Sequence, residues 1–262
     1  MPLLSARDRS YLQDLFAKVP GKVKVLLFVD SESGRCQYCG QTAELVAELA
    51  GLSDRVAYEV VEIGQQPERA QGYDVDKVPA LVLLREDGTD TRVRYFGIPA
   101  GYEFGSLVED LVDVSNGTTR LSAATRQKLS RITQPVHIQV FVTPTCPYCP
   151  KAVRLAHQFA MESPFVRADM VEALEFPELA DRYGVYGVPK TVINDRQEVE
   201  GAVPEAVMLQ YVLAAVGLAE EPGDPWGEAD AGDDHHPDHA HHHHHHDHDH
   251  HHDHGSHGHR EA

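Results

Sequence analysis

Short apolar runs alternate with segments of helical spacing along the first 218 residues of the chain. Residues 24–29 and 137–142 are almost wholly apolar and have the length of buried strands. Each run leads into a Cys-x-x-Cys pair, and apolar residues then return every three or four positions, as on one face of a helix. The pattern therefore predicts, twice in the chain, a strand followed by a helix that begins at the cysteines.

Each half continues with a second strand, a short helix, a hairpin and a closing helix. Turn signals at Asp87-Gly88 and Asn194-Asp195 mark the two hairpins. The predicted order is thus strand, helix, strand, helix, hairpin, helix. The second strands fall at 55–63 and 165–171, the first hairpin strands at 80–84 and 190–194, and the closing helices near 104–114 and 205–216.

The two halves are repeats of each other. Cys36 lies 43 residues before Pro79, and Cys146 lies 43 residues before Pro189, which gives an offset of 110 between the halves. Similar amphipathic segments, at 4–16 and 121–133, precede the first strand of each half, and Ser5 is placed to cap the earlier one. A length of 262 residues suits two units of about 100 residues, each with a modest core, and a tail.

The cysteine content limits the class of protein. All four cysteines belong to the two pairs, so none is left for the structural cross-links of a secreted disulfide scaffold. The first residues carry charges from Arg7 onward and contain no long apolar run, so we expect neither a signal peptide nor a membrane span. The cytoplasm is the expected location.

The net charge of −18 comes mostly from the end of the chain. Residues 219–262 contain twelve acidic residues and one basic residue, and so contribute −11. The remaining body is mildly acidic and has no basic stripe. Nucleic acids and anionic membrane surfaces are therefore excluded as expected partners.

The position of the cysteines favours thiol chemistry. A sulfur at a helix N-terminus faces unpaired backbone N–H groups and the positive end of the helix dipole, which lower the pKa of the thiol. Cys36 and Cys146, at the exposed end of each pair, are the predicted attacking thiolates. Cys39 and Cys149, one turn later, are the predicted resolving cysteines.

A strand, a CxxC pair, a helix and a Val-Pro dipeptide 43 residues later resemble the pattern of thioredoxins and glutaredoxins. The sequence TPTCPYCP at 143–150 is similar to glutaredoxins, and CQYC followed by CPYC resembles the tandem protein disulfide oxidoreductases found mainly in thermophilic archaea and bacteria. This resemblance covers about residues 1–218. It implies that Pro79 and Pro189 are cis prolines and that Val78 and Val188 offer backbone groups to the substrate.

The expected fold is α/β, with two tandem thioredoxin-like units, 1–115 and 116–218, and a disordered His-rich tail at 219–262. The resemblance implies a role in cell redox homeostasis, with redox-active disulfides and no required cofactor. The expected partners are protein thiols and disulfides, and either a thioredoxin-reductase-like reductase or glutathione. Because Gln37 stands where the second site has Pro147, we expect unequal sites, with the main activity at Cys146.

Two alternatives remain at this point. Four cysteines in CxxC pairs also suit a zinc site, but zinc ribbons separate such pairs by about 15–20 residues, far less than here. A glutathione-dependent glutaredoxin is the narrower enzyme alternative, which the CPYC sequence favours.

The tail supports a further hypothesis, a metal-binding or metal-delivery role. Residues 219–262 hold sixteen of the eighteen histidines, and they have too few apolar residues to form a core. The run at 241–246 matches a purification tag, but histidines interspersed with Asp and Gly extend well beyond it, which favours a natural tail. Such residues suit Zn, Ni, Cu or Co. The candidate ligands are His235, His236, His239, His241, His242, His243, His244, His245, His246, His248, His250, His251, His252 and His254.

Overall fold

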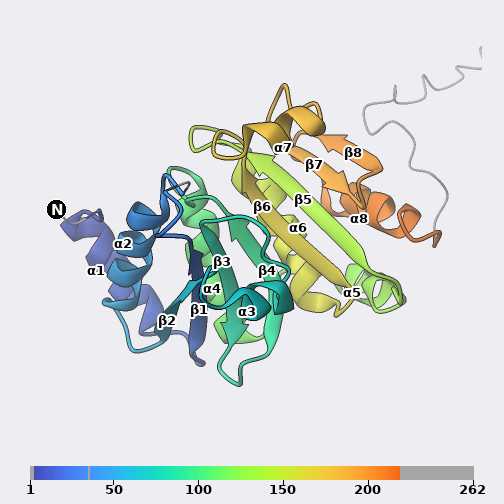
Figure 1. Cartoon of the computed structure of the whole chain (residues 1–262). Coiled ribbons are helices and arrows are strands. Elements are labelled where there is room, and N and C mark those ends of the chain that lie inside the picture. The colour runs from blue at the N-terminus through green and yellow to red at the C-terminus, as the bar shows by residue number, and fades with distance from the viewer. Residues whose placement is uncertain (1–2, 35, 219–262) are drawn as a thin grey trace, which may run out of the picture. The chain divides into compact units, whose positions relative to one another are not determined.

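The computed structural model describes residues 3–34 and 36–218 (Figure 1). The predicted tail therefore lies outside the described residues. The first half contains α1 (Ala6–Phe16), β1 (Val23–Val29), α2 (Cys39–Ala50), β2 (Val56–Glu62), α3 (Pro67–Gly72), β3 (Ala80–Arg85), β4 (Asp90–Phe96) and α4 (Glu103–Asn116). The second half contains α5 (Ala123–Leu129), β5 (Val136–Val142), α6 (Cys149–Glu162), β6 (Val166–Glu172), α7 (Pro177–Arg182), β7 (Lys190–Ile193), β8 (Gln197–Glu200) and α8 (Glu205–Ala214).

This element order confirms the predicted alternation, and local chemistry explains several of the boundaries. The Ser5 hydroxyl accepts a hydrogen bond from the Asp8 backbone N–H at 3.2 Å and so caps α1. Ser122 caps α5 in the same way, through the N–H of Thr125 at 3.1 Å. In the second hairpin, Asn194 and Asp195 both adopt the positive φ angles that a tight turn requires.

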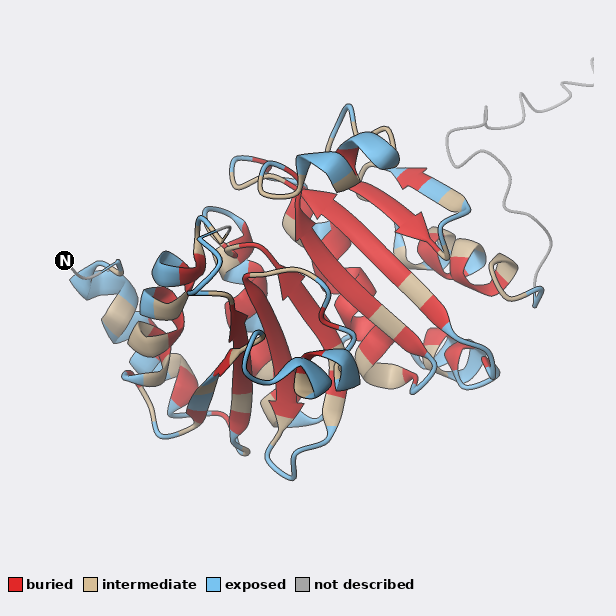
Figure 2. Cartoon of the chain, in the orientation of Figure 1, coloured by how far each residue is buried: buried red, intermediate tan, exposed pale blue. Residues whose placement is uncertain are grey.

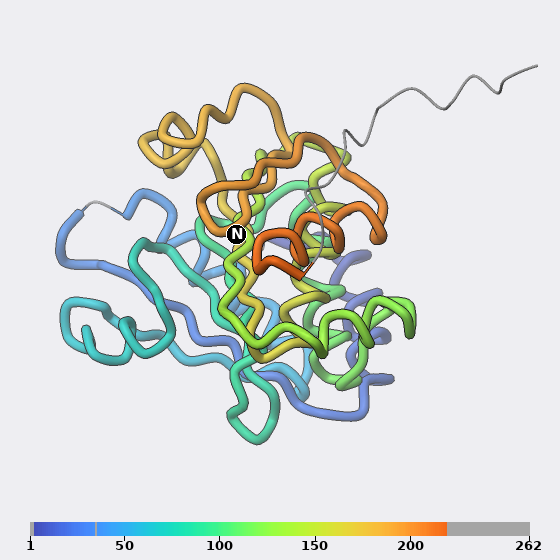
Figure 3. The backbone as a smooth tube through the Cα atoms, turned by 90° about the vertical axis from the view of Figure 1, so that its right-hand side faces the viewer, coloured from blue at the N-terminus to red at the C-terminus, as the bar shows by residue number. Residues whose placement is uncertain are grey.

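All eight strands form one sheet, in the order β2-β1-β3-β4-β6-β5-β7-β8 (Figure 3 shows the path of the backbone from the side). The two halves join where β4 pairs with β6 in parallel, Val93 to Phe96 lying beside Ala168 to Val171. Because β1 and β4 are both antiparallel to β3, and β6 is parallel to both β4 and β5, strands β1 and β5 run in the same direction. The strands that lead to the two cysteine pairs therefore end at the same edge of the sheet.

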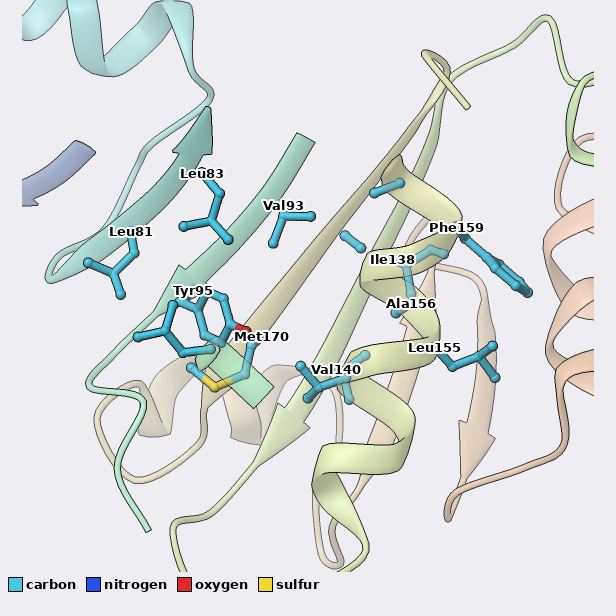
Figure 4. Close-up of a cluster of buried hydrophobic side chains, with 14 of the residues drawn as sticks. Leu81, Leu83, Val93, Tyr95, Ile138, Val140, Leu155, Ala156, Phe159 and Met170 are labelled. Atoms are coloured by element: carbon cyan, nitrogen blue, oxygen red, sulfur yellow. The ribbon is translucent and has the colours of Figure 1, made fainter. Parts of the chain in front are cut away.

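The core is continuous across the join, whereas the length of the chain had suggested two separate cores. Most strand residues are buried (Figure 2). On the face covered by α2, α4 and α6, one apolar cluster includes Leu81 and Val93 from the first half and Ile138 and Phe159 from the second (Figure 4). The opposite face, covered by α3 and α7, holds a second cluster that also draws on both halves. The β4–β6 pairing explains this difference, since it leaves no gap in the sheet.

A group of buried polar residues links α4 to α6 at the join. The Asp110 carboxylate of α4 contacts the Tyr95 hydroxyl, the Arg154 guanidinium and Nδ1 of His157, the last at 2.6 Å. Arg154 also forms an ion pair with Asp113. Burial, helped by the charge of Arg154, lowers the pKa of His157 to about 3, so this histidine is neutral. We call these five residues the seam cluster; it fixes the helix that starts at Cys149 against the first half.

In the part of the chain that the structure describes, no helix combines the length and the apolar character needed to cross a bilayer.

Candidate redox site

The four cysteines form two disulfides, Cys36–Cys39 and Cys146–Cys149. The Cα atoms are 5.5 Å apart in both pairs. Cys39 and Cys149 are the first residues of α2 and α6, so each pair lies at a helix N-terminus, as the periodicity predicted. At the second site Cys146 is 7% exposed and Cys149 is fully buried, which leaves Cys146 as the more accessible sulfur.

Backbone groups surround the Cys146 sulfur. The N–H of Cys149 donates a hydrogen bond to Cys146 Sγ over 3.1 Å, and the carbonyl oxygen of Val188 lies 3.7 Å from the same sulfur. An N–H donor stabilises the negative charge of a thiolate, as does the positive end of the α6 dipole. This geometry suits a nucleophilic Cys146 after reduction of the disulfide.

The two Val-Pro loops are cis and are held alike. Both Val78-Pro79 and Val188-Pro189 have cis peptide bonds, as the resemblance implied. The Pro79 carbonyl accepts a hydrogen bond from the N–H of Gly97 at 2.9 Å, and the Pro189 carbonyl accepts one from Gly201 at 2.8 Å. The same support for each loop shows that the repeat extends to the surroundings of the two sites.

A buried glutamate beside the second site escaped the sequence analysis. The N–H of Tyr102 donates to the Pro144 carbonyl at 3.1 Å, so α4 of the first half begins against the loop that carries Cys146. Glu103 follows this contact and is 1% exposed. Burial raises the pKa of Glu103 to about 7, and a hydrogen-bonding interaction with Ser106 opposes that rise. In the sequence, Glu103 looks like an ordinary acidic residue in the first turn of a helix.

Glycines allow the close approach of the loop before α4. Gly101 has a φ of +60°, and a Cβ atom there would lie 2.1 Å from the Pro144 carbonyl oxygen. Gly97 has a φ of +91°, and its Cβ would lie 2.6 Å from Cβ of Glu172. Next to Gly97, the N–H of Ile98 donates to Glu175 Oε1 at 2.6 Å. The loop at 97–102 is therefore held by the second half at both of its ends.

The histidines of the body have partners that the sequence did not reveal. His157 belongs to the seam cluster, and Nε2 of His137 lies 2.6 Å from Asp169 Oδ2. Both contacts join secondary-structure elements, which fits the structural roles expected of these residues.

The structure also bears on metal binding. Among the described residues there is no group of three or more His, Cys, Asp or Glu side chains arranged to hold a metal ion. Strands β1 and β5 are four strand spacings apart in the sheet, on the order of 19 Å. Zinc–sulfur bonds are only about 2.3 Å long, so the two pairs do not share one zinc ion. The predicted histidine ligands, all within 235–254, lie outside the described residues.

Comparison with known proteins gives the family. The pattern of the thioredoxin domain matches residues 22–109 and 136–214, and the chain belongs to the thioredoxin domain family. Its two-unit form is similar to the protein disulfide oxidoreductase of Aeropyrum pernix, with 33% identity and a TM-score of 0.76, covering 84% of this chain and 97% of that one. The N-terminal NTD_N/C domain of the alkyl hydroperoxide reductase AhpF from Enterococcus faecalis is 27% identical with a TM-score of 0.74, covering 80% of this chain and 99% of that domain.

Curated relatives are longer proteins. An NADH dehydrogenase of Bacillus subtilis is 25% identical over 173 residues, which are 66% of this chain and 31% of the relative. The corresponding alkyl hydroperoxide reductase protein AhpF of Staphylococcus aureus is 21% identical over 215 residues, 82% of this chain and 38% of the relative. The chain thus spans about a third of the length of these relatives.

Proposed function

We propose that the chain is a thiol–disulfide oxidoreductase that acts on protein disulfides through mixed-disulfide exchange. The observation that carries this proposal is the second site, where the Cys149 N–H at the start of α6 donates to Cys146 Sγ. The two-unit likeness to the Aeropyrum pernix protein disulfide oxidoreductase supports it. Cys36 and Cys146 are the proposed nucleophiles, and Cys39 and Cys149 the resolving cysteines.

The reaction begins with the reduced pair. The Cys146 thiolate attacks one sulfur of a client disulfide, so that a Cys146–client bond forms and the other client sulfur leaves as a thiolate, which takes up a proton. Cys149, after losing its proton, attacks Cys146 Sγ and releases the first client sulfur as a thiol. The client disulfide has gained two electrons, and the Cys146–Cys149 pair has become a disulfide.

The Val-Pro loops are the proposed substrate-binding elements. Val188 lies next to the attacking sulfur, and Val78 holds the same place before the cis proline of the first unit. An extended client segment bound along Val188 brings its cysteine to Cys146. Pro79 and Pro189 keep these loops turned toward the disulfides.

Glu103 is the proposed proton acceptor for the buried thiol of the second site. Its pKa of about 7 allows it to take up and return a proton near neutral pH. The first half supplies this residue to the site of the second half, which supports Cys146 as the main site of activity.

Insulin reduction by dithiothreitol tests the central proposal, with Cys36→Ser, Cys146→Ser and the double variant. We expect a loss of rate in each single variant, larger for Cys146→Ser, and no catalysed rate in the double variant. If all three variants reduced insulin as fast as the wild type, the redox assignment would be wrong.

The proposed partners are protein thiols and disulfides, with a thioredoxin-reductase-like reductase or glutathione as electron donor. The reducing cytoplasm is the proposed location, because it keeps such pairs supplied with electrons. Reduction of the oxidised chain by either donor, followed by thiol titration, distinguishes a reductase-dependent enzyme from a glutaredoxin.

A further inference from the structure

Each unit has a groove between its short helix and its Val-Pro loop. The groove of the second unit has a volume of about 310 Å³. Val188 lines this groove, and the carbonyl oxygen of the same residue lies 3.7 Å from Cys146 Sγ. The groove is therefore continuous with the place where a client cysteine reacts.

The walls of the second groove are apolar and uncovered. Leu174 is 73% exposed and Tyr186 is fully exposed, although both are large apolar residues. Tyr148, between the two cysteines, is 70% exposed beside the same sulfur. Among the described residues that line the groove, Asp181 alone is charged. Exposed apolar residues gathered next to a reactive group are typical of a binding surface.

The groove of the first unit has the same framework, in which Pro67, Ala70 and Val75 match Pro177, Ala180 and Val185 at the offset of 110. Its side walls differ in chemistry. Asp76 stands where the second unit has Tyr186, and Gly64 where it has Leu174.

The first groove is also charged by an ion pair across the join. Asp74, in its wall, lies 3.2 Å from the guanidinium of Arg167, which comes from β6 of the second half. Asp76 pairs with the neighbouring Lys77 at 2.5 Å. An apolar side chain placed in this groove would remove these charges from water, which is costly.

We propose that the Leu174–Tyr186 groove binds a large apolar side chain of the client, close to the client cysteine that reacts with Cys146. This inference rests on the proposed function and adds the client class to it. The first groove, with its charges, does not select such a side chain. The two sites thus differ in the sequences that they accept.

The size and position of the groove support this occupant. A cavity of about 150 Å³ is enough to hold benzene, so the second groove accommodates an aromatic or branched aliphatic side chain. A client strand that runs along Val188 places its cysteine on one side of this residue and a neighbouring side chain on the other. Hydrophobic pockets discriminate between side chains by about 10- to 200-fold in kcat/KM.

Two peptides test the proposal in the full chain carrying Cys36→Ser and Cys39→Ser, so that the second site reacts alone. Each peptide has one cysteine joined to a chromogenic arylthiol by a disulfide, with Phe beside the cysteine in one and Asp in the other. The Cys146 thiolate bonds to the peptide sulfur and releases the arylthiolate, whose absorbance gives the rate. We expect the Phe peptide to react at least about 10-fold faster.

The matched variant gives the second site the residues of the first, Leu174→Gly with Tyr186→Asp. We expect it to lose the preference for the Phe peptide while reacting normally with a small aryl disulfide that has no peptide. The reciprocal variant, Gly64→Leu with Asp76→Tyr and with Cys146→Ser and Cys149→Ser, should gain that preference at the first site. Both substituted pairs lie at the surface, and thermal melting checks that each variant is folded.

The outcomes separate the two proposals. An unchanged Phe preference in Leu174→Gly/Tyr186→Asp, or equal rates for both peptides with the second site intact, overturns the groove. Absence of reaction with both peptides and with the small aryl disulfide overturns the proposed function instead.

Discussion

A single backbone N–H, that of Cys149, sets an expectation for the acidity of Cys146. It donates to the sulfur at the positive end of α6. In the reduced chain carrying Cys36→Ser and Cys39→Ser, we expect the Cys146 thiol to have a pKa below the usual value of about 8.5, between roughly 3.5 and 7.5. Thiolate absorbance in the ultraviolet during a pH titration measures it. A pKa at or above the usual value would contradict the assigned nucleophile.

The charge of Glu103 is expected to make stability depend on pH. Its pKa is raised from 4.5 to about 7 in the folded protein, so the folded state binds this proton more tightly than the unfolded chain. The stabilisation is fully present below pH 4.5 and is lost as the pH rises through about 7. At about pH 8, Glu103→Gln should therefore raise the free energy of unfolding, by up to about 3 kcal/mol, and at about pH 4 it should have little effect.

Urea unfolding of the oxidised protein at both pH values measures this difference. Glu109→Gln is the matched control, because Glu109 lies on the same helix with about half of its side chain exposed. An equal effect of Glu103→Gln at the two pH values would disprove the assigned burial effect.

At the scale of residues, the sequence revealed the groups whose chemistry is local. The cysteines and the Val-Pro dipeptides are marked by spacing and by repetition. Glu103 was missed because its burial depends on the contact of Tyr102 with Pro144, residues that are 42 positions apart in the chain. The difference between Asp76 and Tyr186 was visible in the sequence, but only the grooves give it a meaning.

At the scale of elements, the seam cluster joins α4 to α6 through buried charges. Replacing Arg154 by Met leaves Asp110 buried without its cation, so we expect a loss of about 3–5 kcal/mol in the free energy of unfolding. Adding Asp110→Asn to Arg154→Met removes the unpaired charge and should recover part of that loss. Urea unfolding of both variants at neutral pH measures the effect. A single variant as stable as the wild type would show that the cluster does not hold the helices together.

Hydrophobic periodicity predicted the elements themselves, because each short run needs only one buried face. The pairing of β4 with β6 was not predictable in this way. The apolar positions of both strands are compatible with many neighbours, and their partners are decided by contacts between the units. His157 was seen as isolated for the same reason, since Asp110 belongs to the other half of the chain.

At the scale of the whole molecule, the histidines beyond residue 218 give a prediction that the described part of the chain does not address. We expect the full chain to bind Zn²⁺ at neutral pH and to lose this binding as the pH falls through about 6.5, where histidine becomes protonated. Calorimetric titration with Zn²⁺ about one pH unit above and below that value measures it. A chain truncated after Leu218 is the control, and equal uptake by both chains would remove the tail from consideration.

The join between the halves has a consequence for self-association. It brings together two different edges, the last strand of one unit and the outermost strand of the other, so it is a head-to-tail contact. The counterparts of β4 and β6 at the ends of the sheet are β8 and β2, and the same contact between molecules would repeat without closing into a ring. At the join Arg94 lies opposite Asp169.

Transferring this register to two neighbouring molecules would place Glu198 of β8 opposite Glu59 of β2. Like charges facing each other across strands oppose pairing, and β8 is only four residues long. The duplication that fused two units thus stops at two, because the outer edges carry charges that discourage growth into a linear polymer.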